Sequence, residues 1–468
     1  MSETELHDVA AAPESELDED DRLKPAFVRA VLEAVAAGDF ETAHARVEPL
    51  HPADIADLVE LTPSEDRPAL VSAIADLIDG DVLAEMNDWV REALVDALTA
   101  TQVADLASEL DTDDAVAIIE DMEPEDQREV LKALDPDDRA AIEEALSYPE
   151  ESAGRLMQRE LIAVPEHWSV GDVLDYLRGH EDLPTDFWEI FVVDPAHKPV
   201  GTCALSWILR TPRVVSMADV MKREQTLIPV DMDQEEVALR FQKYALISAA
   251  VVDPAGRLVG MITVDDIVHI ISEEAGEDIL RLSGAGEGDI NEPVLTTVRT
   301  RLIWLVVNLG TAMIAASVVN LFDKVIAGYA LLAALMGIVS GMGGNAGTQT
   351  LAVTVRALAT NQLTKSNMAR TVLRELRIAT VNGASLGAMI GLGTLVIFQY
   401  PTLSLVFGLS LLINNLVAGL SGVLIPLTMD RLRIDPAISS AVFVTLMTDT
   451  LGFATFLGLA TLFQVSGG

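Results

Sequence analysis

The sequence predicts a multidomain membrane protein: an acidic all-α helical-repeat domain, an α/β tandem repeat, and an α-helical domain with five membrane spans. Charge is the first observation behind this prediction. Residues 1–298 hold 68 acidic and 21 basic residues, whereas residues 299–468 hold five acidic and ten basic residues. Hydropathy is the second, because residues 302–463 contain five apolar runs long enough to cross a bilayer, which takes about 20 residues. A repeated strand pattern in residues 151–271 is the third.

The charge imbalance limits the classes of partner. A net charge of −47 over residues 1–298 argues against binding nucleic acid and suits either cation binding or solubility alone. The single cysteine, Cys203, excludes an intramolecular disulfide and a cysteine metal cluster. The first residues are polar and acidic, so we expect no cleaved signal peptide.

Residues 1–150 divide into a tail and a helical domain. Residues 1–22 are acidic and poor in aromatic residues, which predicts a disordered tail. Residues 23–150 carry apolar residues at helical spacing. Their carboxylates could be an ordinary solvated surface. Similar helix starts predict a short, irregular solenoid: Thr62–Arg67 before Leu70, Glu123–Arg128 before Leu131, and Asp135–Arg139 before Ile142.

Residues 151–271 change to strand-like spacing and contain an internal repeat. The expected strands are Leu161–Val164, Ile190–Val193, Thr226–Val230, Ala249–Val252 and Leu258–Ile262. The matched positions are Met157 with Met221, Val192–Pro195 with Val251–Pro254, and Val200-Gly201 with Val259-Gly260. The two copies resemble a tandem pair of CBS domains.

That resemblance implies that an adenine nucleotide such as ATP binds in the cleft between the copies. The matching residues are Thr263 and Asp266, whose hydroxyl and carboxylate could hold phosphate and ribose. The first copy has Ala204 and Trp207 at these positions, so at most one site is equipped.

Residues 272–298 are expected to form a connecting helix into the membrane part, continuing an acidic helical stretch that begins near Asp265. A helix with one apolar and one acidic face is either a spacer or a lever that needs a partner surface. The acidic face carries Glu273, Glu274, Glu277 and Asp278.

The five expected spans are residues 302–322, 325–355, 378–398, 403–427 and 437–463. Basic residues gather before the first span, between the second and third, and between the fourth and fifth. By the positive-inside rule, we expect cytoplasmic N-terminal domains and an outside C-terminus in a plasma or inner membrane.

A glycine-rich stretch, Gly341–Gln349, lies within the second span. Glycine is a weak helix former, and Asn345 and Gln349 are costly against lipid. Small residues also allow helices to approach closely. The stretch is therefore either the lining of a polar pathway or a tight helix–helix contact with one buried amide.

Asp449 lies about halfway along the fifth span, where a carboxylate costs roughly 2.5–3.5 kcal/mol. The span cores contain no Lys or Arg, so the carboxylate either faces a cavity or is buried and protonated. Ala441, Thr445, Thr448 and Gly452 share its helix face. One carboxylate cannot strip water from Mg²⁺, but two from a symmetric homodimer could hold the hydrated ion.

The order of these parts resembles the MgtE family of magnesium channels, and three stretches carry the likeness: Gly343–Gln349, Ile434–Ala437 and Thr448–Gly452. The resemblance implies an ion-binding pore at Asp449. With the helix-face argument, the predicted pore residues are Asp449, Asn345, Gly343, Gly344, Gly347, Gln349, Thr445 and Ala441. The predicted regulatory Mg²⁺ ligands are Asp265, Asp266, Glu273, Glu274, Glu277 and Asp278.

Two residues depart from the family's pattern. Gly337 stands where many members carry Pro, which leaves the kink of the second span open. His269 stands where an acid is usual on the connecting helix, which weakens one regulatory position.

The sequence therefore predicts a Mg²⁺-selective channel or transporter, a homodimer in the lipid bilayer. It imports Mg²⁺ and closes when cytosolic Mg²⁺ bridges its acidic domains and connecting helix. The alternatives are transport of Co²⁺ or Mn²⁺, and a membrane sensor that signals through its CBS pair without transport. The sequence has no nucleophile–base set, Walker loop or metal triad, so we do not expect an enzyme.

Overall fold

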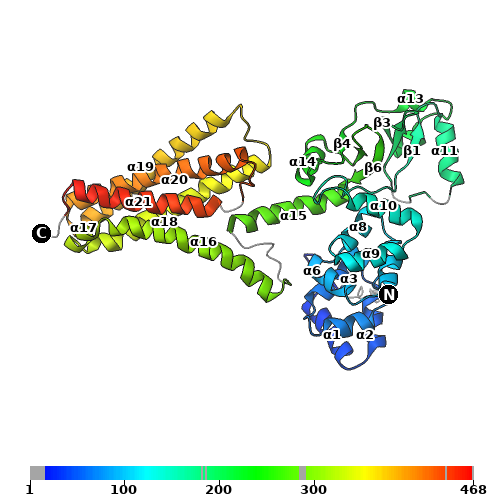
Figure 1. Ribbon diagram of the computed structural model, residues 1–468, viewed down its shortest axis with the longest axis horizontal. Coiled ribbons are helices and arrows are strands. Elements are labelled where there is room, and N and C mark those ends of the chain that lie inside the picture. The colour runs from blue at the N-terminus through cyan, green and yellow to red at the C-terminus, as the bar shows by residue number, and fades with distance from the viewer. Residues whose placement is uncertain (1–15, 181–182, 185–186, 284–290, 438–439, 466–468) are drawn as a thin grey trace, which may run out of the picture. The chain divides into compact units, whose positions relative to one another are not determined.

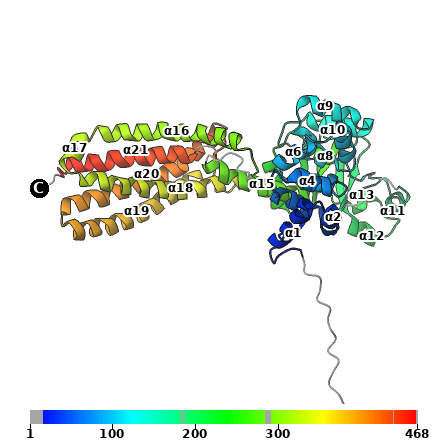
Figure 2. The same ribbon diagram turned by 90° about the horizontal axis from the view of Figure 1, so that it is seen from below.

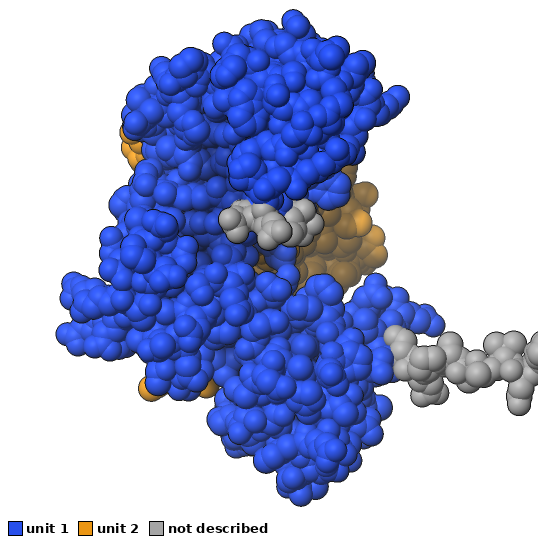
Figure 3. All heavy atoms as spheres, turned by 90° about the vertical axis from the view of Figure 1, so that its right-hand side faces the viewer, with its two compact units in different colours: residues 1–271 blue, residues 272–468 orange. Residues whose placement is uncertain are grey.

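The computed structural model describes residues 16–465 except 181–182, 185–186, 284–290 and 438–439. The chain divides into two compact units, Met1–Ile271 and Ser272–Gly468, which Figure 3 colours separately. The first holds short helices and two β-sheets, and the second holds long apolar helices. This confirms the predicted fold class.

Residues 25–146 fold into short helices (Figure 1), and each helix contributes to one apolar core. Leu70 and Ile142 lie in that core, and Leu131 packs on it, as the repeat predicted. The helices are α1 Pro25–Ala36, α2 Phe40–Val47, α3 Pro52–Leu61, α4 Arg67–Ala73, α5 Gly80–Ala84, α6 Asp88–Val95, α7 Ala100–Ala107, α8 Thr112–Glu120, α9 Pro124–Ala133 and α10 Pro136–Leu146.

The predicted disordered tail, residues 1–22, differs from the structure at its end. Leu17 and Leu23 pair as a β-bridge, and Asp18 accepts hydrogen bonds from the backbone of Asp20 and Arg22. These bonds form a turn ahead of α1. Residues 1–15 lie outside the described part of the chain.

The three similar helix starts share one role in the fold. Arg67 Nε donates to the carbonyls of Val59 and Thr62 near the end of α3, at 3.1 and 3.0 Å. Arg139 and Gln127 donate in the same way to carbonyls at the ends of α9 and α8. The last carbonyls of a helix have no intrahelical donors. Each repeat therefore caps the helix before it.

Two three-stranded sheets follow, one for each copy of the sequence repeat. In each sheet the first strand pairs parallel with the second, and the second pairs antiparallel with the third. The strands are β1 Ala163–Pro165, β2 Glu189–Val193, β3 Pro199–Ala204, β4 Leu227–Pro229, β5 Ser248–Val252 and β6 Leu258–Thr263. The helices beside them are α11 Val170–Gly179, α12 Leu205–Arg210, α13 Met217–Val220 and α14 Gln234–Tyr244.

The two copies interlock through their glycines. A Cβ on Gly201 would lie 2.8 Å from Met221 Sδ, and one on Gly260 would lie 2.7 Å from Met157 Sδ. Each methionine precedes one copy and packs against the glycine of the other. The residues matched between the copies therefore make two equivalent contacts, and each contact joins one copy to the other.

Helix α15, Val264–Ser283, begins directly after β6. Asp266 in its first turn caps its start, because Asp266 Oδ2 accepts hydrogen bonds from the hydroxyl (2.6 Å) and the N–H of Thr263, the residue before the helix. The connecting helix expected at residues 272–298 has other bounds in the structure. It starts at Val264, residues 284–290 lie outside the described part, and Val294 begins the next helix.

Among the described residues of the second unit, five helices are long and apolar enough to span a membrane. Figure 2 shows them running side by side. A short helix, α17 Asp323–Gly328, precedes the second span, which begins at Leu331 rather than Val325. The spans are α16 Val294–Asn320, α18 Leu331–Ala359, α19 Met368–Phe398, α20 Pro401–Arg431 and α21 Ser440–Leu462.

Helix α20 packs against α18, α19 and α21. A Cβ on Gly419 would lie 2.8 Å from Ala379 Cβ on α19, and one on Gly422 would lie 2.8 Å from Thr350 Cβ on α18. Small residues serve this purpose in membranes, where lipid supplies no hydrophobic drive between helices. The two glycines therefore let α18 and α19 both approach α20 closely.

Candidate functional site

The mid-span carboxylate of Asp449 meets a hydroxyl group from another helix. Ser340 Oγ on α18 donates a short hydrogen bond to Asp449 Oδ1 on α21. Both residues are partly buried within the single chain. In the ion pairs of the described residues, Asp449 has no basic partner. The site is therefore one carboxylate with a neutral donor.

Asn414 on α20 brings three helices together beside this pair. Its side chain is fully buried, and Nδ2 donates to a backbone carbonyl of α18 at 2.8 Å. Gly343 on α18 and Gly452 on α21 both face it, and a Cβ on Gly452 would lie 2.7 Å from Nδ2. Asn414 Oδ1 is buried without a donor among the described residues, so it remains an open acceptor.

The glycine-rich stretch is helical throughout, and its glycines lie on two faces of α18. Gly343 and Gly347 face α20 and α21, where a Cβ on Gly347 would lie 2.5 Å from Val444. Gly341 and Gly344 face open space, because nothing lies within 4 Å of their Cβ positions. Two glycines therefore make helix contacts and two leave a bare surface, and the pathway interpretation stays a prediction.

The other predicted pore residues divide in a similar way. Asn345, Gln349 and Thr445 are exposed in the single chain. Ala441 packs beside an apolar cluster that includes Leu351. Gly337, where a kink was in question, lies within the continuous helix and has no neighbour within 4 Å of its Cβ position.

Four polar residues of the spanning helices were not among the predicted site residues: Ser340, Asn414, Asn415 and Glu375. The adjacent amides Asn414 and Asn415 were detectable, since two amides in mid-span are as costly as Asn345. Ser340 gave no such signal. Glu375 lies outside the predicted third span, because the apolar run starts only at Ile378 whereas α19 starts at Met368.

A second group of acids gathers around α8 and the start of α15, within the first unit. Asp113 and Asp114 lie in the first turn of α8, and Asp265 and Asp266 in that of α15. Burial, and then the charge of Asp266, raises the pKa of Asp113 well above its usual value and that of Asp114 to about 6. A cation at this position would relieve the repulsion.

Direct contacts hold the helical domain on the CBS pair beside these acids. Glu160 accepts hydrogen bonds from the N–H and the hydroxyl of Thr112 at 3.2 and 2.8 Å. Arg155 pairs with Glu120 at 2.8 Å, and Arg159 pairs with a glutamate of α10 at 2.5 Å. The acids of α8 and α15 are therefore kept close in spite of their like charges.

The candidate nucleotide residues, Thr263 and Asp266, are bonded to each other as the cap of α15. Asp266 also belongs to the acidic group around α8. Burial raises the pKa of Asp266, while its hydrogen bond from Thr263 lowers it. Both side chains thus have structural partners, and nucleotide binding stays a prediction.

The last turns of α15 are tied to the segment before α21. Arg281 pairs with Glu277 at 2.6 Å and with Asp435 at 3.1 Å. Leu282 packs against the cluster formed by the ends of α18 and α21. Glu273 and Glu274 lie on the same helix, and the side chain of Asp278 lies outside the described part.

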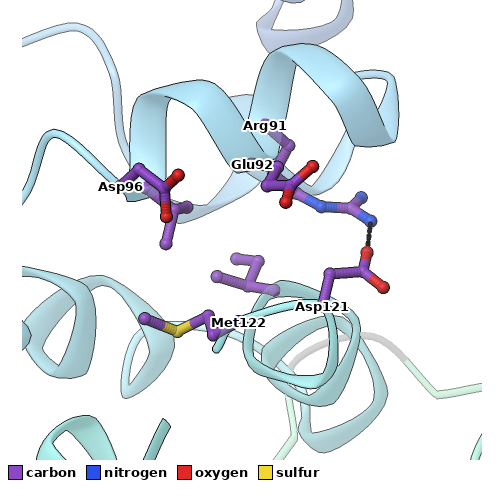
Figure 4. A pocket seen from close by; sticks show the side chains of 7 residues that line it. Arg91, Glu92, Asp96, Asp121 and Met122 are labelled. Atoms are coloured by element: carbon purple, nitrogen blue, oxygen red, sulfur yellow. Dashed lines mark ion pairs between the residues drawn. The ribbon is translucent and has the colours of Figure 1, made fainter. Parts of the chain in front are cut away.

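Another acidic hollow lies in the helical domain between α6 and the end of α8 (Figure 4). Glu92, Asp96 and Asp121 line it together with Arg91. Arg91 pairs with Asp121 at 3.5 Å and with Asp88 at 2.6 Å. The guanidinium already supplies the positive charge there, so this hollow does not need a cation.

Direct metal coordination is not preformed in the described residues. They contain no group of three or more His, Cys, Asp or Glu side chains placed to hold a metal ion. Single carboxylates, amides and open acceptors suit an ion that keeps most of its water, as Mg²⁺ does.

Family models match three parts of the chain. Residues 336–459 match MgtE, described as a divalent cation transporter. Residues 50–151 match the MgtE intracellular N domain, and residues 217–273 match a CBS domain. The first match contains Ser340, Asn414 and Asp449.

Three curated relatives bear the name magnesium transporter MgtE. The one from Thermus thermophilus is 33% identical over 324 residues, 68% of this chain and 72% of the relative. The one from Enterococcus faecalis is 31% identical over 322 residues, 69% of this chain and 71% of the relative. The one from Bacillus subtilis is 28% identical over 418 residues, 89% and 93% of the two chains.

Two solved structures resemble the soluble part of the chain. The cytosolic domain of the Mg²⁺ channel MgtE in complex with ATP is 27% identical, with a TM-score of 0.48, and covers 52% of this chain and 99% of its own. The soluble part of a magnesium transporter is 22% identical, with a TM-score of 0.46, and covers 53% and 98%.

The two glycine faces of α18 predict different costs for the same substitution. Gly343→Ala places a methyl group on the Asn414 amide, so we expect a loss of about 1–3 kcal/mol in stability. Gly344→Ala meets nothing and removes a weak helix former, so it should be neutral or stabilising by up to about 1 kcal/mol. Thermal unfolding in detergent measures both, and equal losses would contradict the two-face assignment.

The acids around α8 and α15 predict a pH dependence. The pKa of Asp114 is raised to about 6 where the helical domain contacts the start of α15. The Asp114 carboxyl therefore binds a proton more tightly when this contact is formed than when it is broken. The contact should therefore gain stability as the pH falls from 7.5 to 5.5 in EDTA, and lose it as the pH rises through 6. Protease protection of residues 1–271 measures this. Asp114→Asn should flatten the profile, and an unchanged profile in that variant would refute the assignment.

Proposed function

The chain belongs to the MgtE family of divalent cation transporters, and from this premise we propose that it carries Mg²⁺ across a cell membrane past Asp449. The Ser340–Asp449 hydrogen bond between two apolar helices is the observation that supports the proposal most strongly. A carboxylate at that depth is costly and normally marks an ion pathway. The family itself consists of transporters and not of enzymes.

The ion passes with its water shell. Asp449 supplies negative charge, and the open Oδ1 of Asn414 accepts hydrogen bonds from ion-bound water. The bare surface at Gly341 and Gly344 leaves room for that water, with Asn345 and Thr445 exposed nearby on their helices. A second copy facing this surface would enclose the pathway and add a second carboxylate, so the transporter is a homodimer.

Cytosolic Mg²⁺ closes the pathway through α15. An ion shared by Asp113 and Asp114 with Asp265 and Asp266 removes their repulsion and holds α15 against the helical domain. Arg281 and Leu282 link the end of α15 to the segments around α21, the helix that carries Asp449. The connecting helix is therefore a lever, and Glu273, Glu274, Glu277 and Asp278 supply further ligands.

The soluble domains lie in the cytoplasm and the C-terminus lies outside. An adenine nucleotide at Thr263 and Asp266 would have to open the cap of α15, which would couple nucleotide binding to the same helix. Transport of Co²⁺ or Mn²⁺, and signalling without transport, are the alternatives that ion flux separates.

Replacing the mid-span carboxylate tests the pathway. Asp449→Asn keeps the shape and removes the charge, so Mg²⁺ flux into proteoliposomes should fall by at least about tenfold, equivalent to 1.4 kcal/mol. Asp323→Asn, outside the spans, is the matched control and should conduct normally. Normal flux in Asp449→Asn would remove Asp449 from the pathway, and flux of Mn²⁺ or Co²⁺ in place of Mg²⁺ would change the substrate.

Replacing acids of α15 tests the gate. Millimolar Mg²⁺ should protect residues 1–271 from protease more than a monovalent salt of equal ionic strength, because a bridging ion stabilises only the closed contact. Changing Glu273, Glu274, Glu277 and Asp278 to Ala should lower this protection and leave flux high at high Mg²⁺. Four exposed acids of α9 and α10, Glu125, Asp126, Asp137 and Asp138, serve as controls. Equal effects of both sets would mean that the acids only keep the domain soluble.

A further inference from the structure

A cavity of about 200 Å³ lies between α18, α19 and α20, away from the Ser340–Asp449 contact. On α18 it is lined by one helical face that includes Gln349 and Val353, and on α19 by one that includes Glu375 and Asn382. Asn415 on α20 lies at its base. Its position between two flanking helices follows from the close contacts of Gly419 and Gly422 with α19 and α18.

Three amide side chains line this cavity: Asn415 is buried, and Gln349 and Asn382 are exposed in the single chain. Asn415 is 1% exposed, and its Nδ2 donates to the Leu411 carbonyl at 2.9 Å. Its Oδ1, and the amides of Gln349 and Asn382, have no hydrogen bond within the described residues. An apolar cavity of this size stays dry, whereas acceptors aimed into a cavity hold water or a ligand.

Glu375 adds a carboxylate that the proposed pathway does not use. The residue is 6% exposed, in a segment where an unpaired charge is expensive. Its Oε1 accepts a hydrogen bond from Arg374 Nη1 at 2.7 Å. The side chain of Arg374 is 65% exposed while that of Glu375 is 8% exposed. The buried acid is therefore neutralised by a base that can leave it without crossing the protein.

We propose that this cavity is a second cation site, which takes a divalent ion with its water shell. Glu375 supplies the charge, and the amide oxygens of Gln349, Asn382 and Asn415 accept hydrogen bonds from ion-bound water, a donor set that suits hard cations. Arg374 is the counter-ion of Glu375 when the site is empty and moves away when the ion enters. Gln349, predicted as a pore residue, serves this site.

The inference rests on the proposed function, because the transported ion is the one that reaches the site. Gln349 lies nine residues from Ser340 along α18, or about 13 Å at 1.5 Å per residue, toward Arg356. By the positive-inside rule that end of α18 faces the cytoplasm. The site therefore lies closer to the cytoplasm than Asp449 along α18, on the face of that helix opposite Ser340.

Thiol accessibility tests the proposal in the full chain. Val353 lines the cavity but offers no ligand atom, so Val353→Cys is the reporter, in a Cys203→Ser background that removes the only native thiol. A water-soluble thiol reagent should label it in the absence of Mg²⁺. Mg²⁺ at about nine times the Kd should slow labelling roughly tenfold, relative to a monovalent salt of equal ionic strength.

Two neighbouring substitutions then have opposite effects. Glu375→Gln should abolish the protection, whereas Arg374→Gln should reduce the Mg²⁺ concentration for half protection by about two- to fivefold, since a partly exposed ion pair is weak. A purely structural Arg374–Glu375 pair would make both variants fail alike. If Glu375→Gln does not fold, Gln349→Met removes an amide oxygen at similar volume and should also weaken the protection.

Each outcome decides the matter. A thiol that is never labelled shows a dry cavity and overturns the proposal, and so does protection that persists in Glu375→Gln, because closure of the gate then explains it. Asp449→Asn should lose flux and keep the protection. If Asp449→Asn conducts normally and keeps the protection, only the proposed pathway is refuted. If Asp449→Asn loses flux and the reporter protein without this change shows no protection by Mg²⁺, only this second site is refuted.

Discussion

The carboxylate of Asp449 sets the strictest condition on the second unit, because an ionisable group inside a bilayer needs polar surroundings. Three helices meet that condition together. Ser340 of α18 donates to the carboxylate, and Asn414 of α20 lies between α18 and the next turn of α21. Gly343 and Gly452 exist as glycines because the Asn414 amide fills the space of their side chains. Much of the small and polar composition at this level follows from one charged group.

In the first unit the main constraint is repulsion between its many acidic side chains. Arg155 and Glu160 fasten the helical domain to the CBS pair by direct bonds. Beside them, Asp113, Asp114 and Asp266 oppose the same contact, as their raised pKa values indicate. We propose that a divalent cation stabilises this contact, because it would offset the repulsion between the acids. In this proposal helix α15 carries the response, because Asp266 lies in its first turn and Arg281, in its last turn, pairs with Asp435 ahead of α21.

Hydropathy and residue spacing predicted the architecture, because the spans face lipid while the other parts face water, and because helices and strands repeat their apolar residues at different intervals. The tandem repeat matched Met157 with Met221, and in the structure each of these methionines packs on the glycine of the other copy. It did not predict β3, whose Pro and Gly weaken a strand signal, nor the starts of α16 and α19, where helices extend past the apolar run into charged sequence. The hydrogen-bond donor to Asp449 could not be predicted from the sequence, because any hydroxyl group in the four other spans could have donated to it. Ser340 was selected by packing through Gly343 and Asn414.

The central claim is that one pathway past Asp449 carries Mg²⁺ and that cytosolic Mg²⁺ closes it. Current through single channels in excised membrane patches tests both parts at once, with Mg²⁺ as the only permeant cation. As Mg²⁺ on the cytoplasmic face rises from micromolar to millimolar, the open probability should fall steeply while the current of each opening toward the cytoplasm persists. An open probability that does not depend on cytoplasmic Mg²⁺, or the absence of any Mg²⁺ current, would contradict the account.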